Sequence, residues 1–374
     1  MEYIVKQTID KYEKCSDPNQ KYEVIRGKIA TIASDQSGSR FLQKLLAKAS
    51  IAQISDILSE IAPIFWQLMM DKYANYFCQR LFSTSASEQR IIILQSILSH
   101  FFKICCDKKG THTIQTMFDI INKPEEIALI TQAMKGRIKD LSIDTYGHHV
   151  VSKVLSTFKK EKTRDFIFDE SCADFMKLAK NSNGLCVIKE LIHTFKPIKN
   201  QDRESYGSRI FNKILENYLD LIQDPYGNYA VTEAIKSWDK NLCGPLFDKI
   251  RSNMGTFCNQ KYSSNVIEQC LTHSNDKQLK AFIIDLSHSD SLSGHMKSQY
   301  GNYVVQKAIE VLQAREDPEC LLRDYLLPSL RRRLSEIVDK KLRVKWDQII
   351  KDGEQGKPRK RQDVTTEEQT TLAK

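Results

Sequence analysis

Apolar residues recur along most of the chain at the three- and four-residue spacing of an amphipathic helix. The run that begins at Ile51 is representative, because Ile51, Ile54, Leu58 and Ile61 share one face of a helix. No segment of any length alternates apolar and polar residues as a half-buried strand does. The pattern therefore predicts an all-α protein.

No apolar stretch is long enough to cross a membrane. The longest, residues 91–106, is interrupted by polar residues such as Gln95, His100 and Lys103, whereas a spanning helix needs about 20 mostly apolar residues. The N-terminus carries charge from its second residue and has no long apolar core, so we expect no secretory signal.

A nine-residue segment with an acidic or polar start recurs eight times along the chain. The eight copies begin at Asp35, Asp71, Asp107, Asp144, Asn181, Asp224, Gln260 and Ser298. Their fifth residues lie 36, 36, 37, 37, 43, 36 and 38 positions apart, which indicates a repeat architecture. The single long interval contains the polar stretch Lys196–Ser205, which we expect to be a surface loop.

Each segment is typical of a turn followed by the start of a helix. Asp can accept hydrogen bonds from free backbone N–H groups at a helix start, and Gly permits a tight turn. Each unit is thus expected to form helix, turn and helix. One such unit cannot bury its apolar face alone, so neighbouring units must stack into one continuous core.

The ends of such an array need polar outer faces. We therefore predict an N-terminal cap over residues 1–20, eight repeats over 21–315 and C-terminal cap helices over 316–352. Residues 353–374 are polar and weakly patterned, and we expect them to be disordered.

The helix after each turn has one apolar side and one narrow polar side. In the first unit, Ser39, Gln43 and Arg40 fall between 0° and about 100° around the helix, and the apolar residues fall at roughly 200–340°. The same separation recurs in every unit, so stacked units would line one face with polar triplets. The triplets are Ser39/Arg40/Gln43, Asn75/Tyr76/Gln79, Thr111/His112/Gln115, His148/His149/Ser152, Leu185/Cys186/Lys189, Asn228/Tyr229/Thr232, Ser264/Asn265/Glu268 and Asn302/Tyr303/Gln306.

The residue types in the triplets suit the binding of exposed nucleobases. The middle residue is planar in seven of the eight, and an aromatic plane on which a base stacks contributes roughly 1–3 kcal/mol per base. The outer two are mostly amides, hydroxyls or a carboxylate, which match donors and acceptors on a base edge. Leu185, Cys186 and Lys189 can neither stack well nor accept such a hydrogen bond. The triplets His148/His149/Ser152 and Thr111/His112/Gln115 are also irregular. We expect loose or altered readout at these three repeats, with extra or flipped-out bases.

The chain resembles the Pumilio (PUF) family of RNA-binding proteins over residues of about 20–350. Gly38-Ser-Arg-Phe-Leu-Gln, Ser264-Asn-Val-Ile-Glu and Gly301-Asn-Tyr-Val-Val-Gln are similar to that family's first, seventh and eighth repeats. The resemblance implies a right-handed α-solenoid, a curved superhelix of eight PUF repeats with N- and C-terminal capping helices. It also implies one base per repeat on single-stranded RNA that runs antiparallel to the protein.

The resemblance further assigns bases to the best-formed triplets, with the last repeat on the 5′ base. Asn302 and Gln306 would bind uracil with Tyr303 stacked on it, and a carboxylate such as Glu268 suits the N1–H and amine of guanine. Thr232 stands where the family usually has Gln. The implied pairings are uracil with Asn302/Gln306, Asn228/Tyr229 and Asn75/Gln79, guanine with Ser264/Glu268 and adenine with Ser39/Gln43. The implied target is 5′-UGU-N-N-N-UA-3′.

The family's biology implies regulation of messenger RNA through elements in 3′ untranslated regions, by altered translation or decay. The implied protein partners are a deadenylase or other regulatory proteins on the convex face. We expect a monomer in the cytoplasm, with the nucleus or nucleolus as the alternative.

Composition adds little chemistry beyond this. The net charge of +9 permits a polyanionic partner. The ten cysteines include no Cys-x-x-Cys pair, and adjacent His148 and His149 have poor geometry for a metal. We find no phosphate-binding Gly loop and no nucleophile elbow, so we expect no metal, no cofactor and no enzymatic activity.

Two other functions remain open from the sequence. A PUF-like factor of ribosome biogenesis would grip structured RNA with little base choice, which the irregular middle triplets favour and the terminal triplets oppose. A protein-binding scaffold of the armadillo or HEAT type would use the same face for peptides, but its repeats do not carry this polar triplet.

Overall fold

The computed structural model describes residues 2–158, 161–197, 205–315 and 320–356, and every regular element within these ranges is helical. Most of the predicted surface loop at Lys196–Ser205 lies outside the described residues, as does the predicted disordered tail (353–374) from residue 357 onward. The first two residues of that predicted tail are helical instead. The all-α prediction is confirmed.

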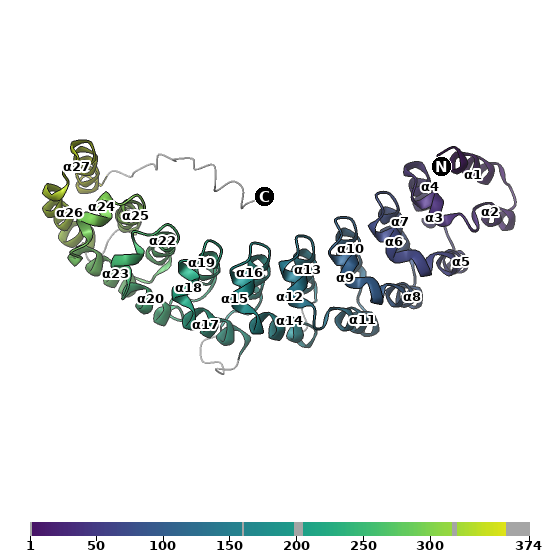
Figure 1. Ribbon diagram of the computed structural model, residues 1–374, viewed down its shortest axis with the longest axis horizontal. Coiled ribbons are helices and arrows are strands. Elements are labelled where there is room, and N and C mark those ends of the chain that lie inside the picture. Colours follow the sequence, from purple (N-terminus) through teal and green to yellow (C-terminus); the bar gives the residue numbers. More distant parts are fainter. Residues whose placement is uncertain (1, 159–160, 198–204, 316–319, 357–374) are drawn as a thin grey trace. The chain divides into compact units, whose positions relative to one another are not determined.

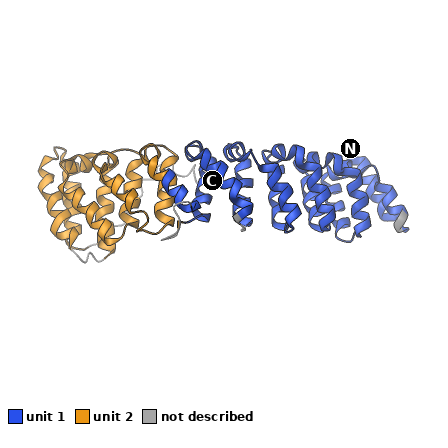
Figure 2. Cartoon of the chain, turned by 90° about the horizontal axis from the view of Figure 1, so that it is seen from below, with its two compact units in different colours: residues 1–196, 202–213 blue, residues 197–201, 214–374 orange. Residues whose placement is uncertain are grey.

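The chain divides into two compact units, residues 1–196 with 202–213 and residues 197–201 with 214–374 (Figure 2). The first unit holds the first five triplets and the second unit holds the last three. Each unit is a stack of repeats with its own apolar interior.

Each repeat has three helices, where the sequence pattern predicted two. A leading helix is followed by a short helix, and a turn then starts the helix that carries the triplet, called here the triplet helix. The leading helices are α2 (Pro18–Ile25), α5 (Ile51–Ile61), α8 (Ser87–Ile97), α11 (Pro124–Met134), α14 (Glu161–Ala173), α17 (Tyr206–Glu216), α20 (Gly244–Arg251) and α23 (Asp276–His288). The short helices are α3 (Ile29–Ala33), α6 (Phe65–Met70), α9 (Phe101–Cys105), α12 (Ile138–Ile143), α15 (Phe175–Ala179), α18 (Tyr218–Ile222), α21 (Met254–Phe257) and α24 (Leu292–Lys297). Two 3₁₀ turns, η1 (Ala62–Ile64) and η2 (Leu98–His100), join leading to short helices.

The triplet helices stand side by side within each unit (Figure 1). In the first unit they are α4 (Gln36–Leu46), α7 (Ala74–Thr84), α10 (Gly110–Ile120), α13 (Gly147–Thr157) and α16 (Gly184–Thr194). In the second unit they are α19 (Gly227–Ser237), α22 (Ser263–His273) and α25 (Gly301–Ala314). In both units each triplet helix packs against the next, so triplets of successive repeats are neighbours.

The interior of each stack is built from the same positions in every triplet helix. The third and seventh residues after the first triplet member are apolar and at most 5% exposed. They are Leu42/Leu46, Cys78/Phe82, Ile114/Phe118, Val151/Leu155, Ile188/Ile192, Val231/Ile235, Ile267/Leu271 and Val305/Ile309. All ten cysteines are free thiols, and the six that are buried fill the core.

Both ends of the array carry additional helices. At the N-terminal end α1 (Glu2–Lys14) packs on α2 and α4. The C-terminal end carries four helical elements: η3 (Leu322–Leu326, a π-helix), α26 (Leu327–Arg333), η4 (Leu334–Glu336) and α27 (Lys340–Glu354). The Trp346 indole of α27 is buried and donates to the Met296 carbonyl at 2.9 Å, which ties this helix to the last repeat.

Candidate nucleic-acid interface

The turns before the triplet helices are held by one recurring arrangement. In seven repeats the residue at the start of the segment accepts hydrogen bonds from two backbone N–H groups, two and three residues later. The acceptors are Asp35, Asp71, Asp107, Asp144, Asn181, Asp224 and Ser298. At Asp35, partial burial would raise the carboxyl pKa, but hydrogen bonds from Ser37 and Gly38 outweigh it and the pKa is lowered. The predicted turn and helix start are confirmed.

Glycine at the fourth position of the segment lets the triplet helix approach the short helix before it. A Cβ atom on Gly38 would lie 2.1 Å from the Ile32 carbonyl oxygen, and one on Gly110 would lie 2.4 Å from that of Ile104. Neither glycine has a positive φ, so the requirement is for space and not for an unusual backbone conformation. In these two repeats the absence of a Cβ atom allows the triplet helix to lie close to the short helix.

The middle members of the triplets reach solvent in most repeats. Tyr76 is 53% exposed and Tyr303 is 41% exposed. Arg40, His112, His149 and Cys186 are also exposed, and Tyr229 and Asn265 are half-buried. Planar groups therefore project from the rows of triplet helices in seven of the eight repeats, as the sequence predicted.

The first members lie deeper than a surface stripe would suggest. Asn75 is 3% exposed and Asn228 is 2% exposed. In both residues, and in half-buried Asn302, the side-chain Nδ2 donates to two carbonyls of the preceding turn, which leaves Oδ1 as the group that can accept a further bond. The other first members except Leu185 are likewise almost covered and hydrogen-bonded: Ser39, Thr111, His148 and Ser264.

The third member of the triplet is hydrogen-bonded to the first member in half of the repeats. In four repeats the Gln Nε2 donates to the oxygen of the first member of its own triplet, at 2.8 to 3.3 Å. The pairs are Gln43–Ser39, Gln79–Asn75, Gln115–Thr111 and Gln306–Asn302. In the first three pairs the amide is thereby oriented, with one N–H donor and its Oε1 acceptor still able to bond another group. The Gln306 Nε2 also donates to the backbone carbonyl of Asn302 at 3.1 Å. A donor beside an acceptor is what a base edge requires.

Four repeats depart from this arrangement. Thr232 is 2% exposed and its hydroxyl donates to the Tyr229 carbonyl of its own helix. Half-buried Glu268 offers carboxylate oxygens, and half-buried Ser152 offers a hydroxyl. In the fifth repeat Leu185 is 6% exposed and contributes no polar atom, and half-buried Lys189 is the cation beside it. The sequence predicted departures in the fourth, fifth and sixth repeats, but not how deeply Thr232 is buried. It also predicted an irregular triplet at Thr111/His112/Gln115, although Gln115 keeps the bond to Thr111.

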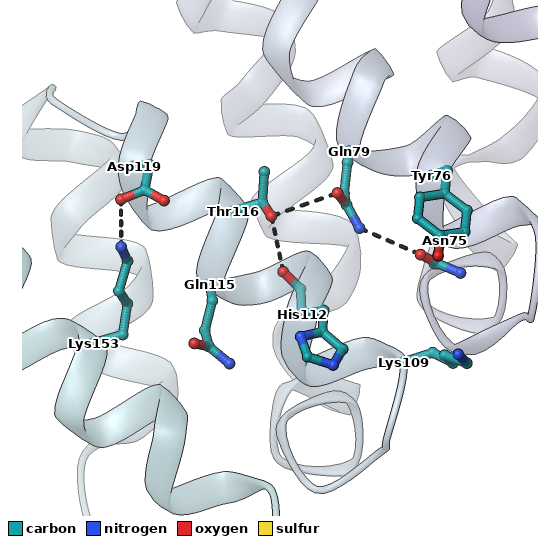
Figure 3. Close-up of a pocket in the computed structure, with 9 residues that line it drawn as sticks. All are labelled: Asn75, Tyr76, Gln79, Lys109, His112, Gln115, Thr116, Asp119 and Lys153. Carbon is teal, nitrogen blue, oxygen red and sulfur yellow. Dashed lines mark hydrogen bonds and ion pairs between the residues drawn. The ribbon is translucent and has the colours of Figure 1, made fainter.

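A depression on the first unit lies along its triplet helices (Figure 3). It is a cleft of about 530 Å³ lined by residues of α7, α10, α13 and the turn before α10. Its walls include the predicted Asn75, Tyr76, Gln79, His112 and Gln115, and also Lys109, Thr116, Asp119 and Lys153. The Lys153 ammonium lies 2.6 Å from the Asp119 carboxylate. The Thr116 hydroxyl donates to the Oε1 of Gln79, a residue of the preceding repeat, at 3.5 Å.

Sequence reasoning missed the last four of these residues. Thr116 and Lys153 lie five positions after the first triplet member of their repeats, and Asp119 lies eight after Thr111. Extending the helical projection by two turns would have placed these three beside the triplets.

Histidines gather at the third and fourth triplets. The rings of His148 and His149 are 3.9 Å apart, and the Nδ1 of His148 donates to the Asp144 carbonyl. Burial and the neighbouring His148 and His112 lower the pKa of His149, so this ring is neutral at pH 7. Across the described residues, no three His, Cys, Asp or Glu side chains are placed to hold a metal ion.

None of the described helices combines the length and the apolar character needed to span a bilayer.

The family model of the Pumilio-family RNA binding repeat matches seven segments of the chain, residues 28–62, 65–98, 100–132, 137–172, 217–250, 253–286 and 296–316. The gap at residues 173–216 contains the fifth triplet helix, whose Leu185/Cys186/Lys189 set is the most divergent. The structure nevertheless keeps the full repeat there, including the Asn181 turn.

Among curated proteins, the chain is 32% identical to Pumilio homolog 12 of Arabidopsis thaliana over 313 residues, which is 82% of this chain and 51% of that protein. It is 28% identical to a Pumilio domain-containing protein of Schizosaccharomyces pombe over 304 residues, 81% of this chain and 44% of the relative. The chain thus spans about half the length of these relatives.

Among solved structures, the chain is similar to the Puf4 RNA binding domain bound to an HO endonuclease RNA 3′ UTR recognition sequence. The TM-score is 0.75 at 25% identity, covering 88% of this chain and 99% of that one. A PUF-8 complex with PBE-RNA shares the fold with a TM-score of 0.73 at 21% identity, covering 92% of this chain and 99% of that one. The chain therefore belongs to the Pumilio family, a non-enzymatic family of RNA-binding repeat proteins.

Proposed function

We propose that this chain binds single-stranded RNA in a sequence-dependent manner and contacts one base with each well-formed triplet. The observation that carries the proposal is the repeated pairing of an exposed planar side chain with an oriented amide, as in Tyr76 and Gln79. The plane offers a stacking surface, and the amide offers one donor and one acceptor.

The last three triplets suit a 5′-UGU element. The oxygen of the Gln306 amide can accept from uracil N3–H, and its Nε2 would donate to a uracil carbonyl in exchange for one of its two bonds to Asn302. The carboxylate of Glu268 can accept from N1–H and the amine of guanine, whereas uracil offers it two carbonyl oxygens. At the other end, Gln79 and Gln43 are oriented by the first members of their triplets and would read the UA step. The proposed target remains 5′-UGU-N-N-N-UA-3′.

The proposed biological role is post-transcriptional regulation of messenger RNA in the cytoplasm through 3′ untranslated regions, by a monomer that recruits regulatory proteins such as a deadenylase. The similar Puf4 domain is bound to a 3′ UTR recognition sequence, which supports this assignment. We propose the eight-repeat region with its two caps as the RNA-binding domain.

A second candidate is a PUF-like factor that grips structured RNA with little base choice. The fifth repeat favours it, because Leu185 presents no hydrogen-bonding group and Lys189 can contact only phosphate or an acceptor. The oriented glutamine amides of the first, second, third and eighth repeats favour the first candidate.

An exchange of triplet residues separates the two candidates. Replacing Ser264→Asn together with Glu268→Gln gives the seventh repeat the outer residues of the eighth. Binding of the wild-type chain and of this variant is measured on RNAs that contain UGU or UUU in the same buffer, with thermal unfolding as the check on folding. The expected result is a preference that moves from UGU to UUU. A loss of affinity for both RNAs with no change of preference would favour the second candidate, which binds RNA with little base choice.

A further inference from the structure

The sixth repeat lacks the side chain that reads a base edge elsewhere. Thr232 occupies the position of the glutamine, but it is 2% exposed and its hydroxyl donates to the Tyr229 carbonyl at 3.1 Å. The first member, Asn228, is also 2% exposed, and its Nδ2 donates to the carbonyls of both Asp224 and Pro225. Alone, the outer members of this triplet could offer a base only the Asn228 Oδ1.

The second and eighth repeats show what is missing. In the second, the Gln79 Nε2 donates to the Asn75 Oδ1 at 3.3 Å, and in the eighth the Gln306 Nε2 donates to the Asn302 Oδ1 at 2.8 Å. In both cases the Oδ1 of the first-position asparagine anchors a second amide.

The seventh repeat supplies an amide in the same relation to Asn228. Asn265 is half-buried at the middle position of its own triplet, and its Nδ2 donates to the Asn228 Oδ1 at 3.3 Å. The donor group, the acceptor group and the distance match those of the Gln79–Asn75 pair, but here the donor comes from the neighbouring triplet helix. After this bond Asn265 still has one N–H and its Oδ1.

We propose that the base at the sixth repeat is read by a composite amide pair, Asn228 from the sixth repeat and Asn265 from the seventh. The proposal rests on the proposed function, since it assigns a further specificity residue to that site. The oxygen of Asn265 accepts from uracil N3–H, and its remaining N–H donates to a uracil carbonyl. Cytosine has an acceptor and an amine at the corresponding atoms, so the pair favours uracil.

This assignment makes two adjacent bases of the RNA depend on one side chain. Asn265 is expected from its triplet position to be the flat surface beside the seventh base. Held by Asn228, it also determines which base the sixth repeat accepts. A residue that only stacks would instead change affinity for all bases at that position by the same factor.

The test measures affinities of full-length chain variants for four RNAs that differ only in the third base of UGU, together with their thermal unfolding. Asn265→Ser removes the amide and leaves a shorter hydroxyl side chain. The expected result is a preference for uracil over cytosine at that base that falls about 5- to 10-fold, the effect of one hydrogen bond. Asn265→Tyr keeps a stacking plane but loses the amide, so it is expected to retain overall affinity and still lose the uracil preference.

Restoring the donor within the sixth repeat provides the matched control. Thr232→Gln combined with Asn265→Ser is expected to recover the uracil preference, because the introduced glutamine could donate to Asn228 as Gln79 donates to Asn75. Equal loss of affinity for all four RNAs in Asn265→Ser, or an unchanged uracil preference in Asn265→Tyr, would overturn the composite pair. A wild-type chain that binds none of the RNAs would instead overturn the proposed function.

Discussion

At the scale of single residues, the sequence was enough to predict which residues form each triplet. It was not enough to predict how deeply those residues are buried. Helical periodicity fixes the direction of Asn75 around its helix, and that direction was correct. It says nothing of how far the neighbouring turn covers the residue, so the near-complete burial of Asn75 and Thr232 was not predicted. The link from Asn265 to Asn228 was also invisible, because it joins residues 37 positions apart in two helices.

The exposed aromatic planes permit a test that separates binding from stability. Tyr303→Ala should weaken RNA binding by about 5- to 150-fold, equivalent to roughly 1–3 kcal/mol for one stacked base. Since Tyr303 is 41% exposed, its loss should change the unfolding midpoint little. Binding is measured by fluorescence anisotropy of a labelled UGU RNA.

Tyr325 is the matched control for Tyr303. It is 39% exposed but belongs to η3, outside the triplets. Tyr325→Ala is expected to bind RNA as the wild type does. Equal losses in the two variants would contradict a stacking role specific to Tyr303.

At the scale of elements, the leading helix, the turn and the triplet helix of each repeat were predicted. The short helix that follows the leading helix was not. In the second repeat, for example, α5 passes into α6 through the 3₁₀ turn η1, and the apolar pattern continues across it. Pro63 is the one strong break in that stretch of sequence. A change of helix direction without a change of period leaves no signal in the hydrophobic pattern.

The contact between triplet helix and short helix predicts which glycines are required. Gly110→Ala should lower stability by about 1–3 kcal/mol, because its Cβ would lie 2.4 Å from the Ile104 carbonyl oxygen. Gly294→Ala in α24 is the control, since nothing lies within 4 Å of its Cβ, and it should be neutral or stabilising by up to about 1 kcal/mol. Thermal midpoints from circular dichroism compare the two, and similar midpoints would show that the close approach at Gly110 does not restrict the side chain.

At the scale of the whole molecule, the number of repeats could be read from the sequence because one short turn motif marks each of them. Even the fifth repeat, which the family model passes over, was identified by Asn181 and Gly184, and the structure places a complete repeat there. The end of the C-terminal cap could not be fixed from the pattern, and α27 continues to Glu354, two residues beyond the predicted limit. Caps have no repeated motif, so their boundaries depend on propensity alone.

Base-by-base readout of RNA by the triplets can be tested by selection from a random RNA pool with the full chain, followed by sequencing of the bound molecules. We predict enrichment of single-stranded sites that contain UGU, followed after three variable bases by UA. The variable bases should face the irregular triplets, including that of Leu185. Enrichment of structured RNAs without a shared sequence, or of a motif in which UGU is absent, would contradict this readout.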